Sequence, residues 1–417
     1  MAFSLNRTAP VPKDLAAVTT VRTENEVDPH SAGADPAAIA AIWAAIERYY
    51  ASGIHPAIQF CLRHRGKILL DRAIGYASGN GPEDSPDAKK IPCTPDTPFV
   101  TLSASKPVTA MLVHLLDQKN LLRLDDPVVE YIPEFGSHGK KWITIRHVLA
   151  HRAGLPSVPA RARAADLLTD QKKILQILCD ARPESRAGRQ LAYHAITGGF
   201  ILAEVVRRVT GKSIADLLKK ELRQKLGARW FTYGLPARDM RKMAHSYFTG
   251  PPALPPFSTL LERAIGVPFR DVPELANDPR FLRSVVPSGN LVATAEEMSR
   301  FYQMLLDGGE WEGKRIFDQR TILRATAEQS YFEMDVSLGL PLRYSMGFML
   351  GARWLSLFGP DTEHAYGHLG FTNIVTWADP DREIAVGLMT SGKPLIYPGL
   401  YYAFDVLLQI GRAFPKK

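Results

Sequence analysis

Cysteine is scarce in this sequence. Only three occur among 417 residues, Cys61, Cys93 and Cys179, and no two of them form a Cys-x-x-Cys pair. An odd number of isolated cysteines argues against a disulfide framework and against a cysteine-ligated structural metal. We expect each of the three to be a small buried apolar residue and not a nucleophile.

Long apolar runs are missing as well. No stretch approaches the roughly 20 apolar residues that a membrane span needs. The first residues, MAFSLNRTAPVPKDL, lack the apolar core of a secretory signal. We therefore expect a cytoplasmic protein without a membrane span.

The charge is basic but not concentrated. The chain has 51 Lys and Arg against 43 Asp and Glu, a net charge of +8, which raises the question of nucleic acid as a partner. The densest basic stretch, residues 161–173, also contains Asp166 and Asp170, and no zinc finger, RNA-binding signature or basic-region helix accompanies it. We expect a small-molecule substrate and no nucleic-acid partner, and we leave a homo-oligomer open.

Apolar residues make up 46% of the chain, enough for a large core, and the length favours two lobes. Near the N-terminus the apolar spacing predicts a helix over residues 35–51 and then a hairpin of two strands, residues 57–62 and 67–70. Residues 106–227 have mostly helical patterns. Further on, Thr294 and Glu297 form a capping box, and two more strands are predicted, residues 371–377 and 384–389.

Strands at both ends and helices between them predict an α+β fold (an α/β sandwich). In it the N- and C-terminal segments build one antiparallel sheet flanked by helices, and an all-helical domain is inserted. The predicted divisions are an extended arm (1–35), a sheet domain (36–105 plus 286–417) and a mainly helical domain with irregular loops (106–285). The active site is expected between the two lobes.

One candidate for catalysis is the Ser-x-x-Lys motif of Ser103 and Lys106. A spacing of three residues puts both side chains on one face of a helix. A serine hydroxyl is a poor nucleophile until a neighbour takes its proton, and a lysine takes it only when its amine is neutral part of the time. An apolar stripe at helical spacing follows, and Pro107 suits a helix start, so Ser103 is expected at a helix N-terminus.

The motif alone is weak evidence, because a second copy occurs at Ser137 and Lys140 in a polar, glycine-containing loop. Ser103 also has a simpler interpretation as a helix cap, and the motif by itself does not decide between the two. Five later segments of the sequence favour the catalytic interpretation of Ser103. In order they are residues 124–133, 143–156, 193–199, 288–290 and 366–370.

In this order and spacing, the segments resemble the serine β-lactamase-like family (class C β-lactamases and penicillin-binding-protein-like enzymes) over roughly residues 40–410. The family also includes family VIII carboxylesterases. The resemblance implies that Ser103 is the acylated nucleophile and that Lys106 and Tyr193 together act as the general base. The positive charge of Lys106 would favour the ionised, phenolate form of Tyr193. The backbone N–H groups of Ser103 and Phe371 would form the oxyanion hole.

The resemblance also implies that the third motif, His368, Leu369 and Gly370, borders the substrate. Tyr344 and Tyr366 are expected beside it as pocket residues. His368 stands where β-lactamases carry a lysine, and we favour a pocket-lining role for it without proton transfer; a half-charged anchor and a satisfied sheet-edge histidine remain alternatives.

Two departures from the family pattern concern the substrate. Ala195 replaces the asparagine of Tyr-x-Asn, and His-Leu-Gly replaces Lys-Thr-Gly. Both remove groups suited to β-lactams and peptides, so the sequence is closest to the family VIII carboxylesterases and favours a carboxylic ester hydrolase. The alternatives are an acyltransferase that passes the acyl group to an alcohol or amine, a β-lactamase or D-peptidase, and a non-catalytic scaffold. His147 and His151 lack the further ligands of a zinc site, so we expect no metal and no cofactor.

Overall fold

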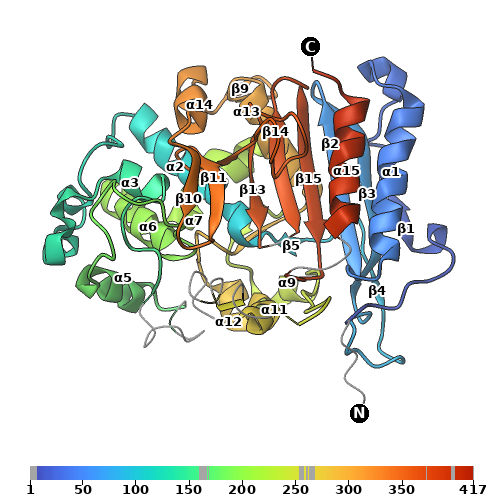
Figure 1. Cartoon of the computed structure of the whole chain (residues 1–417), viewed down its shortest axis with the longest axis horizontal. Helices are drawn as coiled ribbons and strands as arrows, with labels where there is room; N and C mark the ends of the chain where they lie inside the picture. Colours follow the sequence, from blue (N-terminus) through green and yellow to red (C-terminus); the bar gives the residue numbers. More distant parts are fainter. Residues whose placement is uncertain are drawn as a thin grey trace.

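The computed structural model describes residues 7–158, 167, 169–252, 258–259, 262, 268–371, 373–395 and 400–416. Its central feature is an antiparallel sheet with the strand order β1-β3-β2-β15-β14-β13-β12-β11-β10, and β4 pairs with β3 (Figure 1). The strands are β1 (Thr19–Val21), β2 (Ala57–His64), β3 (Lys67–Ser78), β4 (Ile91–Pro92), β10 (Ser330–Asp335), β11 (Leu340–Tyr344), β12 (Met349–Leu350), β13 (Tyr366–Gly370), β14 (Ile374–Asp379) and β15 (Ile384–Thr390).

The two ends of the chain meet in this sheet. Strand β15 pairs with β2 in a register that runs from Ile384 opposite His64 to Thr390 opposite Ile58. The predicted α+β fold, with one antiparallel sheet built from N- and C-terminal segments, is therefore confirmed. Part of the N-terminal arm also belongs to the sheet, because β1 pairs with β3.

Helices cover both faces of the sheet. On one face α1 (Pro36–Ala51) packs beside α15 (Leu400–Ala413), and on the other lies α13 (Ala295–Leu306) (Figure 1). Helix α1 begins where the sequence predicts, because the Asp35 carboxylate accepts a hydrogen bond from the Ala37 N–H and Pro36 occupies the first turn. The capping box of Thr294 and Glu297 is present at the start of α13.

Alternation along β2 sends side chains to two different cores. Ile58 and Phe60 pack with α1 and α15, whereas Ala57 and Cys61 pack on the opposite face, in the larger core that α13 shares with the helical region. All three cysteines are buried and free. Burial raises the pKa of Cys179 to about 11, which fits an apolar role and not a nucleophilic one.

The segment between β5 (Phe99–Val100) and β7 (Leu291–Ala293) is mainly helical. Its principal helices are α2 (Lys106–Gln118), α3 (Ile145–Leu149), α5 (Gln171–Asp180), α6 (Thr197–Thr210), α7 (Ile214–Leu218), α8 (Gln224–Leu226), α9 (Ala237–Met240), α11 (Val272–Asn277) and α12 (Pro279–Arg283). Strand β6 (Thr232–Tyr233) joins β5 and β7 in a small separate sheet. Helix α14 (Gln319–Thr326) and the short pair β8 (Glu310–Trp311) and β9 (Lys314–Arg315) follow α13.

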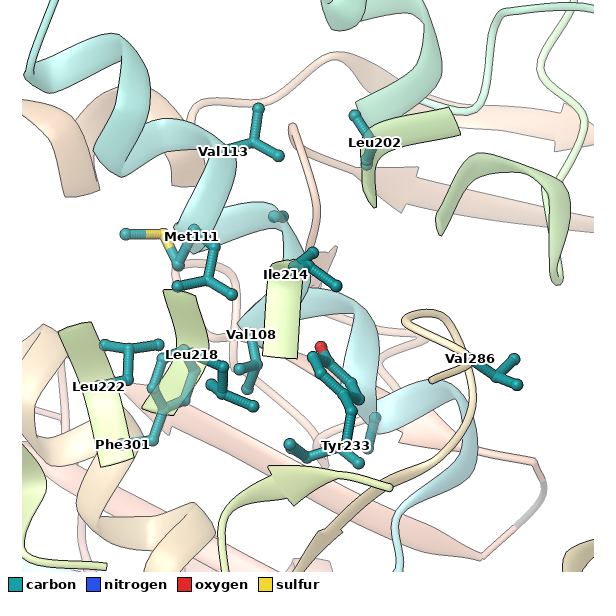
Figure 2. Packing of buried hydrophobic residues seen from close by; sticks show 14 of the residues in the cluster. Val108, Met111, Val113, Leu202, Ile214, Leu218, Leu222, Tyr233, Val286 and Phe301 are labelled. Atoms are coloured by element: carbon teal, nitrogen blue, oxygen red, sulfur yellow. The ribbon is translucent and has the colours of Figure 1, made fainter. Parts of the chain in front are cut away.

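Helix α2 is the element that links this helical region to the rest. Its residues from Lys106 to Leu116 are all buried. Figure 2 shows Val108 and Met111 of α2 among Leu218, Leu222 and Phe301, so residues of α2, α7 and α13 belong to a single apolar cluster. None of the described helices is long and apolar enough to cross a bilayer.

The close packing of α13 on the sheet gives a stability prediction. A Cβ at Gly387 in β15 would lie 2.2 Å from the Ala295 carbonyl oxygen at the start of α13. Gly387→Ala should therefore force the helix away and lower the free energy of unfolding by about 1–3 kcal/mol, measured by denaturant titration. Gly411→Ala in α15 is the control, since its Cβ meets open space; it should leave stability unchanged or raise it by up to about 1 kcal/mol. Equal stability of the two variants would contradict this packing argument.

Candidate active site

Ser103 lies in a tight 3-10 turn, η3 (Leu102–Ser105), between β5 and α2. Leu102, directly before it, has a positive φ of 49°. This left-handed conformation costs a branched residue about 1–2 kcal/mol, and the local hydrogen bonds compensate for it. The Ser105 hydroxyl donates to the Leu102 carbonyl at 2.5 Å and accepts from the Leu291 N–H at 3.0 Å. The turn is thus attached to β7, and Ser103 has a fixed backbone.

Lys106 is the first residue of α2, and its Nζ lies 3.3 Å from Ser103 Oγ. The same Nζ also contacts two backbone carbonyls, those of Ala195 at 2.7 Å and Ser288 at 3.2 Å. No carboxylate of the described residues forms an ion pair with it, and burial lowers the pKa of Lys106 to about 7. The amine is therefore neutral part of the time near neutral pH, as the sequence argument requires.

Tyr193 is buried beside both residues. Its hydroxyl is hydrogen-bonded to Ser103, and the Lys106 Nζ lies 4.7 Å from the centre of its ring. Burial is the largest effect and raises the pKa of the phenol well above its usual value of about 10. The expected stabilisation of a phenolate is thus not supported: at neutral pH Tyr193 is a phenol, because desolvation disfavours its charged form.

The end of β13 closes against the turn that carries Ser103. A Cβ at Gly370 would lie 2.2 Å from the Thr101 carbonyl oxygen, so the two backbones touch at a position where only glycine fits. Phe371 follows with a positive φ of 58°, and its ring stacks on Phe269 with the ring centres 4.6 Å apart. The structure therefore brings the end of β13, directly before Phe371, against the turn that carries Ser103.

His368 lies on the same face of β13 as Gly370, two residues earlier. Its Nδ1 is 2.7 Å from the Leu369 carbonyl and therefore carries the ring proton, while its Nε2 has no hydrogen-bond partner among the described residues. Burial and the charge of Lys106 lower the pKa of His368 to about 3. This shift favours the neutral ring over a half-charged anchor. Leu369 alternates to the other face and packs with the α1 and α15 core.

The two predicted pocket tyrosines lie in different places. Tyr344 stacks on Tyr193 with the ring centres 6.4 Å apart and donates its O–H to Asp335 at 3.2 Å. Tyr366 instead packs against Tyr302 and Phe348, and it borders a groove beside α13 and α14. Tyr344 therefore contacts Tyr193, whereas Tyr366 does not belong to the group of residues around Ser103, Lys106 and Tyr193.

The second Ser-x-x-Lys motif also forms a contact. Lys140 Nζ lies 3.4 Å from Ser137 Oγ, and it binds the carbonyls of Cys179 and Ala181. The Ser137 hydroxyl donates to the Cys179 carbonyl. The predicted loop is a 3-10 segment, η5 (Pro133–Trp142), with a kink at Ser137, and these contacts join it to the end of α5.

Sequence reasoning missed several groups around Tyr193. His151 and His194 stack with ring centres 5.6 Å apart, and His151 Nδ1 accepts from the His194 N–H at 3.1 Å. Asp335, from the far edge of the sheet, accepts from the Tyr193 N–H at 3.1 Å. No local pattern marks these residues, because each acts through backbone contacts. His147 caps α3, and the described residues contain no group of side chains able to hold a metal.

Comparison with known proteins agrees with this geometry. The beta-lactamase family model matches residues 42–402. The esterase/beta-lactamase LipL of Mycobacterium tuberculosis is 28% identical over 322 residues, which cover 72% of this chain and 70% of that protein.

Two solved structures are similar as well. A family VIII carboxylesterase superposes with a TM-score of 0.78 at 25% identity, covering 90% of this chain and 98% of the other. EstA from Arthrobacter nitroguajacolicus Rue61a has a TM-score of 0.73 at 26% identity, covering 89% and 96%. Since the family model spans most of the sequence, this chain belongs to the beta-lactamase family and is a hydrolase with the beta-lactamase fold.

Proposed function

We propose that this protein hydrolyses carboxylic esters through an acyl-enzyme on Ser103. The observation that carries the proposal is the environment of Lys106 Nζ, which has three neighbours: the carbonyls of Ala195 and Ser288, and Ser103 Oγ. A neutral amine has two N–H groups and one lone pair. The two carbonyls take the N–H groups, so the lone pair is directed to the Ser103 hydroxyl, the arrangement that a general base needs.

Tyr193 then has a different role from Lys106. Because its pKa is raised, it is protonated, and its O–H is hydrogen-bonded to Ser103. Lys106 takes the proton of Ser103 as the hydroxyl attacks the ester carbonyl, and Tyr193 gives its proton to the departing alkoxide, which is more basic than a phenolate. The proton on Lys106 returns to Tyr193, and water then releases the acid by the same route.

The ester preference rests on what surrounds the substrate carbonyl. His368 is neutral at the position where a cation would bind a substrate carboxylate, and Ala195 offers only its backbone carbonyl, which Lys106 already occupies. A neutral acyl ester needs neither a cation nor a side-chain amide. The names of LipL, an esterase/beta-lactamase, and of the similar family VIII carboxylesterase support the same class of substrate.

The nucleophile is tested by substitution. Ser103→Ala should abolish hydrolysis of p-nitrophenyl esters and labelling by a fluorophosphonate probe, because no other hydroxyl lies beside Lys106 and Tyr193 together among the described residues. Ser137→Ala is the matched control, since it removes the serine of the second motif, and it should retain both activities. Full ester hydrolysis by Ser103→Ala would refute the acyl-enzyme on this residue.

The pH profile tests the base. Lys106 must be neutral to accept a proton, and its pKa is about 7. kcat/KM should therefore rise about tenfold per pH unit below that value and level off above it. Lys106→Met should lose this activity, and Lys140→Met, at the second motif, should keep both the rate and the profile. A rate that is flat from acid to neutral pH would count against Lys106.

The oxyanion hole is tested at Gly370. Gly370→Ala places a Cβ against the Thr101 carbonyl and should push the Phe371 N–H away from Ser103. Loss of one oxyanion donor costs about 2.7–4 kcal/mol of barrier, so kcat should fall by about 10²–10³-fold. Gly387→Ala has a clash of the same length elsewhere in the sheet and should keep kcat. Equal kcat values in the two variants would exclude this assignment.

A further inference from the structure

Asp335 is a fully buried carboxyl group that the proposed reaction does not use. It ends β10, and its Oδ1 accepts three backbone N–H groups, from Tyr193 at 3.1 Å, Ser337 at 2.9 Å and Leu338 at 3.1 Å. Its Oδ2 accepts the Tyr344 hydroxyl at 3.2 Å. Each of these four neighbours donates to the carboxyl group, which is the environment of a carboxylate and not of a protonated acid.

No basic side chain of the described residues forms an ion pair with this carboxylate. The nearby Arg152 pairs with Glu333 instead. Burial raises the pKa of Asp335, and the backbone hydrogen bonds oppose that effect. A buried charge without an ion-pair partner is expensive, and a neutral residue would usually serve stability better. The position therefore calls for an explanation other than stability.

The carboxylate lies where it fixes the chain around Tyr193. On one side the His151 carbonyl accepts from the Ala192 N–H at 3.0 Å, and His151 Nδ1 accepts from the His194 N–H. On the other side the β10–β11 turn holds the same segment, through Asp335 and through the Val336 N–H, which donates to the Leu191 carbonyl at 3.1 Å. Tyr193 is thus held from both sides at the level of its backbone.

We infer that Asp335 is a positioning residue for Tyr193: its carboxylate holds the backbone N–H of Tyr193, and its buried negative charge opposes ionisation of the phenol, so that the phenol can act as a proton donor. This inference rests on the proposed function, in which Tyr193 protonates the leaving group.

The charged and titratable groups that face Tyr193 are consistent with this role. Lys106 Nζ lies 4.7 Å from the ring centre, and the rings of His151, His368 and Tyr344 lie 4.8, 6.1 and 6.4 Å away. Burial lowers the pKa of both histidines, so they carry no charge at neutral pH. Asp335 adds to burial in raising the pKa of Tyr193. Lys106 is affected by burial alone, so the base should not depend on Asp335.

Two substitutions separate position from charge. Asp335→Asn is isosteric: its amide oxygen keeps the three backbone hydrogen bonds, and the Tyr344 hydroxyl turns to accept from the amide nitrogen, so only the charge is lost. Asp335→Ala loses the hydrogen bonds as well. We expect kcat of Asp335→Ala to fall by about 10²-fold with a smaller change in KM, because Tyr193 shifts. Asp335→Asn should retain most of the kcat of the unaltered protein at neutral pH.

The charge is measured by ultraviolet difference titration of the tyrosines, with Tyr193→Phe variants identifying the Tyr193 signal. Tyr193 should titrate at lower pH in Asp335→Asn than in the unaltered protein. The acidic limb of kcat/KM, set by Lys106, should stay at the same pH. Asp379→Asn is a control at a second buried carboxylate, which accepts backbone N–H groups from Asp381 and Arg382 in another turn and, unlike Asp335, also pairs with the Arg382 guanidinium. It should leave the Tyr193 titration unchanged.

The inference is overturned if Asp335→Ala keeps the kcat of the unaltered protein, or if Tyr193 shows no difference between the unaltered protein and Asp335→Asn up to the pH at which they unfold. The Asn variant keeps the test valid where the Ala variant does not fold. The titration does not require turnover. Full hydrolysis by Ser103→Ala would therefore refute the proposed function and still leave the link between Asp335 and Tyr193 measurable.

Discussion

Lys106 is a buried lysine without a carboxylate in ion-pair contact among the described residues. Its Nζ contacts the carbonyls of Ala195 and Ser288 and the hydroxyl of Ser103. Desolvation therefore makes the amine neutral near neutral pH, and the two carbonyls orient it. Neighbouring elements cover this environment: α2 is buried from Lys106 to Leu116, and β13 lies against the turn that precedes α2.

The same desolvation shifts the pKa values of the neighbouring groups in opposite directions, depending on whether the charged form is a cation or an anion. It lowers the pKa of a lysine or histidine and raises that of a tyrosine or carboxyl group. Burial lowers the pKa of Lys106 to about 7 and that of His368 to about 3, and it raises the pKa of Tyr193, so it favours the neutral form of all three groups. In the proposed reaction, one apolar environment thus supplies both an acceptor and a donor of protons next to the Ser103 hydroxyl.

The two backbone segments that meet near Ser103 each contain a residue in the left-handed conformation. Leu102 and Phe371 both have positive φ, and they lie on either side of the contact between Gly370 and the Thr101 carbonyl. Hydrogen bonds of Ser105 to the Leu102 carbonyl and from the Leu291 N–H stabilise one side. Stacking of Phe371 on Phe269 stabilises the other. Backbone conformations of this kind persist only where the surroundings determine them, as at functional sites.

The sequence by itself determined the elements that have a strong local period or cap. These are helix α1 behind Asp35, the β2–β3 hairpin, helix α13 with its capping box, and the α+β class that follows from strands at both ends. It also selected Ser103, Lys106 and Tyr193 as candidates, because their motifs stand in order along the chain. The choice between the two Ser-x-x-Lys copies needed those later segments, since both lysines are in fact buried against carbonyls.

Only the tertiary structure decided the protonation states and the supporting residues. Burial sets the neutral state of His368 and the protonated state of Tyr193. Asp335 and His151 hold the backbone around Tyr193 through groups that are distant in the sequence. A sequence pattern records which side chain stands at a position. It does not record how much water is removed from that side chain, or which carbonyl or N–H the fold places beside it, and those two quantities set the chemistry of this site.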